Sequence, residues 1–86
     1  MTLNKEDLKN KIIYRASYRG TKEMDILMTA FVKSLINDLD ENYLKTLDLF
    51  VNMDDETLIS LKKKESQNNY KDERMLHIID KFQKFE

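Results

Sequence analysis

The sequence predicts an all-α fold, a compact small bundle of about five short helices. Five successive segments repeat apolar residues at the three- and four-residue spacing of an amphipathic helix. The chain has one glycine and no proline, so few residues interrupt these segments. No segment sustains the alternating apolar and polar residues of a strand, and no Asn-Gly turn occurs. Short amphipathic helices joined by short links are typical of a helical bundle.

The first two predicted helices cover residues 5–18 and 21–38. We expect Asn4 and Thr21 to be their N-caps, since both side chains can accept a backbone hydrogen bond. The first helix repeats an apolar face every four residues, at Leu8, Ile12 and Ala16. The second has a wide apolar surface, which predicts that it is central and contacted on several sides. That surface comprises Met24, Ile26, Leu27, Met28, Phe31, Val32, Leu35, Ile36 and Leu39.

The other three predicted helices cover residues 41–52, 55–63 and 72–85, and a polar linker is expected at 64–71. Asp40 and Asp54 are the expected caps of the first two. We expect an inward-facing set on each helix: Tyr43, Leu44, Leu47, Phe50 and Val51, then Leu58, Ile59 and Leu61, and finally Met75, Ile78, Ile79, Phe82 and Phe85.

Length and composition indicate a single domain over residues 1–86. No apolar run approaches the roughly 20 residues that span a bilayer, and the first eleven residues lack the apolar region of a signal peptide. The chain has no cysteine, which fits a reducing compartment. We therefore expect a cytoplasmic protein without membrane insertion.

The sequence offers no catalytic or metal-binding constellation. His77 is the only histidine and is expected at the surface, and there is no cysteine to complete a transition-metal site. The acidic run at 54–56 lacks the spaced ligands and glycine of an EF-hand, and a helix N-terminus explains it better. The lysine run at 62–64 is expected to be a solvated helix end. A single glycine does not suffice for a phosphate-binding loop.

Charge is distributed unevenly along the chain. Residues 1–22 carry six basic and two acidic residues, residues 23–60 two and nine, and residues 61–86 seven and five. Nucleic-acid binders usually carry a large basic excess on one face, so we expect no nucleic-acid partner. A small basic-helix nucleic-acid binder is the alternative, and strong, salt-sensitive binding to nonspecific DNA would favour it.

The joint between the first two helices concentrates residue types that anchor protein interfaces. Tyrosine and arginine are enriched among such anchors, and this joint holds Tyr14, Arg15, Tyr18 and Arg19 beside Gly20. We expect Gly20 to end the first helix. We also expect the same turn to present Arg19 and Glu23 together on one exposed corner, as a protein-binding surface.

The stretch IIYRASYRGTKEMDILMTAF, residues 12–31, resembles the SdhE family of succinate dehydrogenase flavinylation factors. That family carries an R-G-x-x-E motif after a basic and aromatic first helix, with an aspartate two places further on. Arg19, Gly20, Glu23 and Asp25 match this pattern position by position. The segment DETLISL, residues 55–61, matches a looser family pattern, D-x-D-L-x-x-W, without its second acid and its tryptophan. The resemblance covers roughly residues 8–61.

The resemblance implies an SdhE-like helical domain that is not an enzyme. It implies a factor that binds the flavoprotein subunit of succinate dehydrogenase, or of fumarate reductase, and promotes covalent attachment of FAD to a histidine there. The FAD belongs to the client, so no stably bound cofactor is expected, and we expect the free protein to be a monomer. The implied partner-binding residues are Arg15, Tyr18, Arg19, Gly20, Glu23 and Asp25. Asp25 could instead be structural, paired with a base of the first helix.

Two further alternatives give the chain a different class of function. An antitoxin-like regulatory module would also use a protein-binding surface. A bare structural bundle would dimerise through the last helix, if Phe82 and Phe85 were exposed.

Overall fold

The computed structural model describes residues 4–63 and 70–85, and within these ranges all regular structure is helical. This confirms the predicted fold class. The elements are α1 (Lys5–Ser17), α2 (Lys22–Leu35), a short 3₁₀ helix η1 (Ile36–Asp38), α3 (Glu41–Val51), α4 (Asp55–Lys62) and α5 (Glu73–Lys84). The second predicted helix therefore ends in a tighter 3₁₀ turn, a common way for the last turn of an α-helix to finish.

Side-chain caps fix where the helices begin. The four predicted caps are confirmed, because each side chain accepts a hydrogen bond from a backbone N–H of the first turn: Asn4 from Asp7, Thr21 from Met24, Asp40 from Tyr43 and Asp54 from Thr57. Asp72, predicted as the first residue of the last helix, caps α5 by accepting from the Arg74 N–H at 3.0 Å. Each such cap typically stabilises its helix by about 1 kcal/mol.

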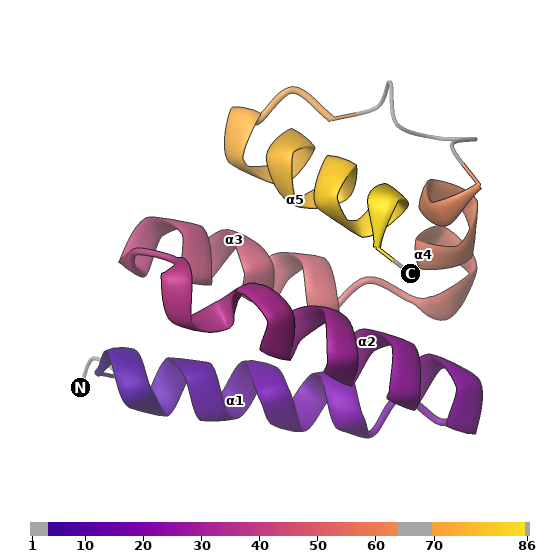
Figure 1. Ribbon diagram of the computed structural model, residues 1–86, viewed down its shortest axis with the longest axis horizontal. Helices are drawn as coiled ribbons and strands as arrows, with labels where there is room; N and C mark the ends of the chain where they lie inside the picture. Colours follow the sequence, from indigo (N-terminus) through magenta and orange to yellow (C-terminus); the bar gives the residue numbers. More distant parts are fainter. Residues whose placement is uncertain (1–3, 64–69, 86) are drawn as a thin grey trace.

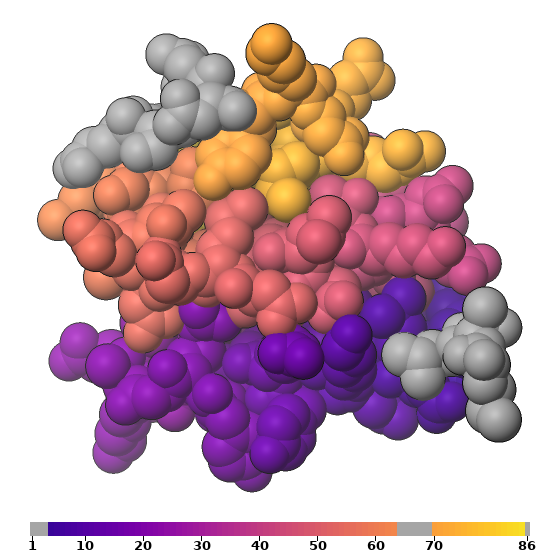
Figure 2. Space-filling view, turned by 180° about the vertical axis from the view of Figure 1, so that it is seen from behind, coloured from indigo at the N-terminus to yellow at the C-terminus, as the bar shows by residue number. Residues whose placement is uncertain are grey.

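The helices surround one cluster of buried side chains. α1 packs against α2 and α3, while α5 packs against α3 and α4. Figure 1 shows α1 and α5 at opposite edges of the molecule, and Figure 2 shows α3 and α4 between them from behind. Phe31 of α2 is buried in this cluster, with its ring centroid 5.1 to 5.8 Å from those of Phe50, Phe82 and Phe85. α2 thus contacts α1, α3 and the end of α5, so the prediction that it is contacted on several sides is confirmed.

Most of the predicted inward-facing residues are buried or half-buried, but two are not. Ile26 is 61% exposed and Ile59 is 42% exposed, so their predicted burial is wrong. α4 packs through a narrow face that holds Leu58 and Leu61, and Ile59 lies about 100° around the helix from Leu58. Ile26 likewise lies outside the stripe of α2 that meets its neighbours.

The structure also corrects expectations about the C-terminal third. Phe82 is fully buried and Phe85 is half-buried against the core, so the exposed aromatic face needed for dimerisation through the last helix is absent from residues 73–85. Residues 64–69 of the predicted linker lie outside the described residues, but Tyr70 packs against the core. Of the described helices, none has the length and apolar character that a bilayer crossing requires.

Candidate functional site

The turn between α1 and α2 depends on its glycine. Tyr18, the C-cap residue after α1, has φ −128° and ψ 65°, and Gly20, two residues further on, has a φ of +112°. Residues with a β-carbon rarely adopt this conformation. A Cβ built on Gly20 would nevertheless meet no heavy atom within 4 Å. The glycine is therefore required by the backbone, and the space in front of it is open.

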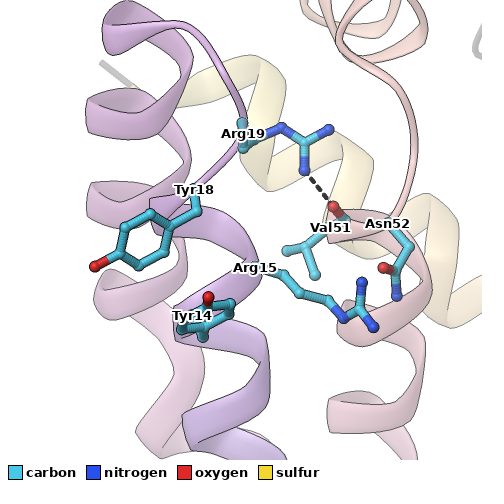
Figure 3. A pocket seen from close by; sticks show the side chains of 6 residues that line it. All are labelled: Tyr14, Arg15, Tyr18, Arg19, Val51 and Asn52. Atoms are coloured by element: carbon cyan, nitrogen blue, oxygen red, sulfur yellow. Dashed lines mark hydrogen bonds between the residues drawn. The ribbon is translucent and has the colours of Figure 1, made fainter.

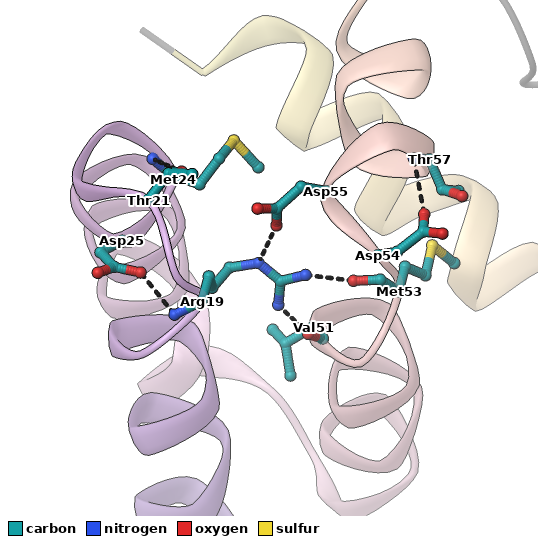
Figure 4. A network of polar contacts seen from close by, with 9 residues as sticks. All are labelled: Arg19, Thr21, Met24, Asp25, Val51, Met53, Asp54, Asp55 and Thr57. Carbon is teal, nitrogen blue, oxygen red and sulfur yellow. Dashed lines mark hydrogen bonds and ion pairs between the residues drawn. The ribbon is translucent and has the colours of Figure 1, made fainter.

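Arg19 does not lie on an exposed corner, and that prediction is wrong. Its side chain is only 8% exposed. The guanidinium crosses to the link between α3 and α4, where it donates to the backbone carbonyl oxygens of Val51 and Met53. Its Nε also donates to the Oδ1 atom of Asp55 at 2.8 Å (Figure 4). A helix leaves its last carbonyl groups without intrahelical partners, and the planar guanidinium supplies donors to that end of α3.

Asp25 holds the same turn from the other side. Its Oδ1 atom accepts a hydrogen bond from the backbone N–H of Arg19 at 2.5 Å (Figure 4). The structural role suggested for Asp25 is thus present, although its partner is the backbone of the turn and not a basic side chain of α1. Arg19 is consequently fixed at its backbone by α2 and at its side chain by the α3–α4 link.

The acidic run at 54–56 has two structural uses. Asp54 caps α4, as predicted, and hydrogen bonds from the side chain and backbone of Thr57 hold the pKa of Asp54 below its usual value. The nearby charge of Arg19 lowers this pKa further. Asp55 is the ion-pair partner of Arg19, a role that the sequence did not indicate. Within residues 4–63 and 70–85, no three His, Asp or Glu side chains are placed to hold a metal ion.

The remaining residues of the R-G-x-x-E motif face solvent. Gly20 and Glu23 are both exposed. Among the described residues, no ion pair or side-chain hydrogen bond engages the Glu23 carboxylate. The turn between α1 and α2, here called the corner, therefore has two kinds of residue. Arg19 and Asp25 hold it through internal hydrogen bonds, whereas Gly20 and Glu23 are exposed on it.

A hollow lies beside this corner, between the end of α1 and the end of α3. Its volume is about 280 Å³, and it is lined by Tyr14, Arg15, Tyr18, Arg19, Val51 and Asn52 (Figure 3). Tyr14 and Tyr18 are 65% and 71% exposed, and the centroids of their rings are 4.7 Å apart. The predicted cluster of tyrosine and arginine is thus assembled in space. Asn52, the C-cap residue of α3, joins it from a distant part of the sequence, so sequence proximity could not indicate this contribution.

Of the residues predicted to lie at the surface, His77 is exposed but Lys62 is bonded to the end of α5. His77 is exposed, as expected, with its ring 5.7 Å from that of Tyr43. Lys62 is not a solvated helix end, because its ammonium donates to the carbonyl oxygens of Phe82 and Phe85 at the end of α5. It also lies 5.1 Å from the centroid of the Phe82 ring. Lys63 is exposed, and Lys64 lies outside the described residues.

Comparison with known proteins gives two matches. The model of a family described as "Flavinator of succinate dehydrogenase" matches residues 10–84. The chain is also 33% identical over 55 residues to the Arabidopsis thaliana protein named "Succinate dehydrogenase assembly factor 2, mitochondrial". The matched residues make up 64% of this chain and 29% of the plant protein, so the chain spans less than a third of that relative. No solved structure matches the chain.

Proposed function

The chain belongs to the family of succinate dehydrogenase flavinators, and we propose that it binds the flavoprotein subunit of succinate dehydrogenase and promotes its covalent flavinylation. This family consists of assembly factors and not of enzymes. The observation that carries the proposal is the corner at Gly20 and Glu23. It is open to a partner, and the hydrogen bonds of Arg19 with Asp25 and Asp55 fix its backbone.

Each residue of the corner has a distinct part in this proposal. The missing side chain of Gly20 lets a client backbone come close, since nothing occupies the space in front of it. The carboxylate of Glu23 accepts hydrogen bonds from the client, and Arg15 and Tyr18 extend the contact along α1. Arg19 and Asp25 act indirectly, by fixing the turn. A surface that is already ordered loses little entropy on binding.

The chain would then act by orienting its client. The flavoprotein supplies both the FAD and the histidine that becomes attached to it, so the chain needs no stably bound cofactor of its own. Docking at the corner holds the client in the arrangement in which its histidine and flavin meet. Such orientation can lower a barrier by up to about 7–11 kcal/mol. Under this proposal the SdhE-like domain comprises residues 1–86 and acts in the cytoplasm as a monomer. The flavoprotein subunit of fumarate reductase is the alternative client.

Replacing Glu23 with alanine should reduce covalent flavin on a co-expressed flavoprotein subunit roughly tenfold, as expected for loss of an interface anchor. The change removes a carboxylate that no described residue pairs with, so the variant should keep its helical content and lose at most a few degrees of melting temperature, from the helix dipole alone. Covalent flavin is measured as fluorescence of the denatured flavoprotein band.

Glu56→Ala is the matched control. Glu56 is the second residue of α4, as Glu23 is of α2, and both are exposed. Each substitution removes a similar interaction with a helix dipole, about 0.3–1 kcal/mol. Glu56→Ala should therefore leave flavinylation unchanged. Equal flavinylation by the two folded variants would exclude Glu23 from the docking surface, and unfolding of Glu23→Ala alone would make its role structural.

A further inference from the structure

Building on the proposed function, we propose that the hollow beside the corner binds an acidic peptide segment of the flavoprotein subunit, with Arg15 pairing with its carboxylate. Arg15 extends from α1 across the hollow towards Asn52 at the end of α3 (Figure 3). It is exposed, and among the described residues no carboxylate pairs with it.

Neighbouring cations along α1 and the turn are already engaged. Lys11 pairs with Asp48 at 3.3 Å, and Arg19 pairs with Asp55. Arg15 lies between them in sequence and lacks such a partner among the described residues. Proximity to the C-terminal end of α3 would favour a positive charge without any ligand. That effect does not account for the two exposed tyrosine rings that line the same hollow.

The other groups of the hollow suit a peptide better than a free anion. Asn52 uses its amide nitrogen to donate to the Asp48 carbonyl oxygen at 2.7 Å, so its side-chain oxygen remains as an acceptor for a peptide N–H. The adjacent rings of Tyr14 and Tyr18 offer an exposed apolar surface that also carries hydroxyl groups. The guanidinium of Arg19 is occupied by internal acceptors, which leaves Arg15 as the cation available in the lining. A small free anion would need several convergent donors.

Charge and position support the same ligand. Residues 1–22 carry six basic and two acidic residues, and two of the six, Lys11 and Arg19, pair with Asp48 and Asp55 of the chain. The smaller basic excess that remains, which includes Arg15, favours association with an acidic surface. Arg19 belongs both to the wall of the hollow and to the turn that carries Gly20. A segment bound in the hollow would therefore continue directly onto the corner that the proposed function uses.

The test is titration of purified flavoprotein subunit with the full chain and with its Arg15→Glu variant. We expect Arg15→Glu to raise the Kd roughly 30-fold at about 50 mM NaCl, with a smaller difference at about 500 mM, because salt screens an exposed ion pair. Arg15→Lys should raise it about fivefold, since the charge is kept but the planar fork is lost. Lys33→Glu, the same charge change at an exposed residue of α2 outside the hollow, should change it by less than about threefold.

The outcomes separate the two proposals. If the unmodified chain fails to bind the flavoprotein, both the proposed function and this inference fail. If it binds but Arg15→Glu behaves like Lys33→Glu, the inference alone is overturned. Titration of the chain with succinate and with FAD tests a free anion as the ligand. Micromolar binding of either molecule that disappears in Arg15→Glu would assign the hollow to that anion and overturn the acidic segment.

Discussion

Replacing Arg19 with alanine should lower the free energy of unfolding by about 3 kcal/mol, the scale expected when a buried charged partner is removed. The guanidinium is nearly inaccessible and serves the Val51 and Met53 carbonyl groups and the Asp55 carboxylate at once. Without it, two carbonyl groups lose their donors and a partly buried carboxylate loses its counter-ion. In a chain of this size the melting temperature should fall by roughly 12–24 °C.

Arg15→Ala is the matched control for this measurement. It removes the same side chain from an exposed position of the preceding helix. Surface substitutions of this kind usually stay within about 0.5 kcal/mol. Both variants can be compared by thermal or urea denaturation followed by circular dichroism. If Arg19→Ala melted like Arg15→Ala and yet lost flavinylation, Arg19 would act by contacting the client and not by holding the turn.

Replacing Gly20 with arginine should reduce flavinylation of a co-expressed flavoprotein at least tenfold, as expected for a bulky group placed in an interface core. The side chain would project into the open space in front of the turn, where the client is proposed to approach. The positive φ of Gly20 adds a backbone strain of about 1–3 kcal/mol for any residue with a β-carbon.

Gly20→Ala separates these two effects. Alanine carries nearly the same backbone strain as arginine but projects only a methyl group, so the two variants should melt at similar temperatures. Gly20→Ala should retain more covalent flavin than Gly20→Arg when both are compared at a temperature where both are folded. Equal covalent flavin on clients of the two variants would show that the space in front of Gly20 is not part of the docking surface.

Local chemistry made much of the fold predictable. The caps Asn4, Thr21, Asp40 and Asp54 follow from side chains that satisfy the first turn of a helix, and all four are present. The apolar repeat likewise identified most of the core. Burial of Ile26 and Ile59 was predicted wrongly because a hydrophobic residue beside a stripe is buried only if a neighbouring helix covers it. Periodicity within one helix does not indicate where its neighbours lie.

In the candidate site, too, local features were predictable from the sequence and contacts between distant segments were not. The joint of α1 and α2 was identifiable from residue types close together in the sequence, and the hollow confirms that Tyr14, Arg15 and Tyr18 line one surface. The burial of Arg19 was not predictable, because its acceptors are the carbonyl groups of Val51 and Met53, more than thirty residues further along the chain. Backbone carbonyl groups carry no sequence signature. Asn52 was missed for the same reason.

We propose that this chain promotes covalent attachment of FAD to the flavoprotein subunit. The most direct test of this proposal is to incubate purified apo-flavoprotein with FAD, with and without the purified chain, and to follow covalent flavin by fluorescence of the denatured subunit. An inert protein at equal concentration serves as the control. We expect covalent flavin to form several-fold faster with the chain, because docking orients the histidine and the flavin of the client. Equal rates and extents of attachment with the chain and with the inert protein would contradict it.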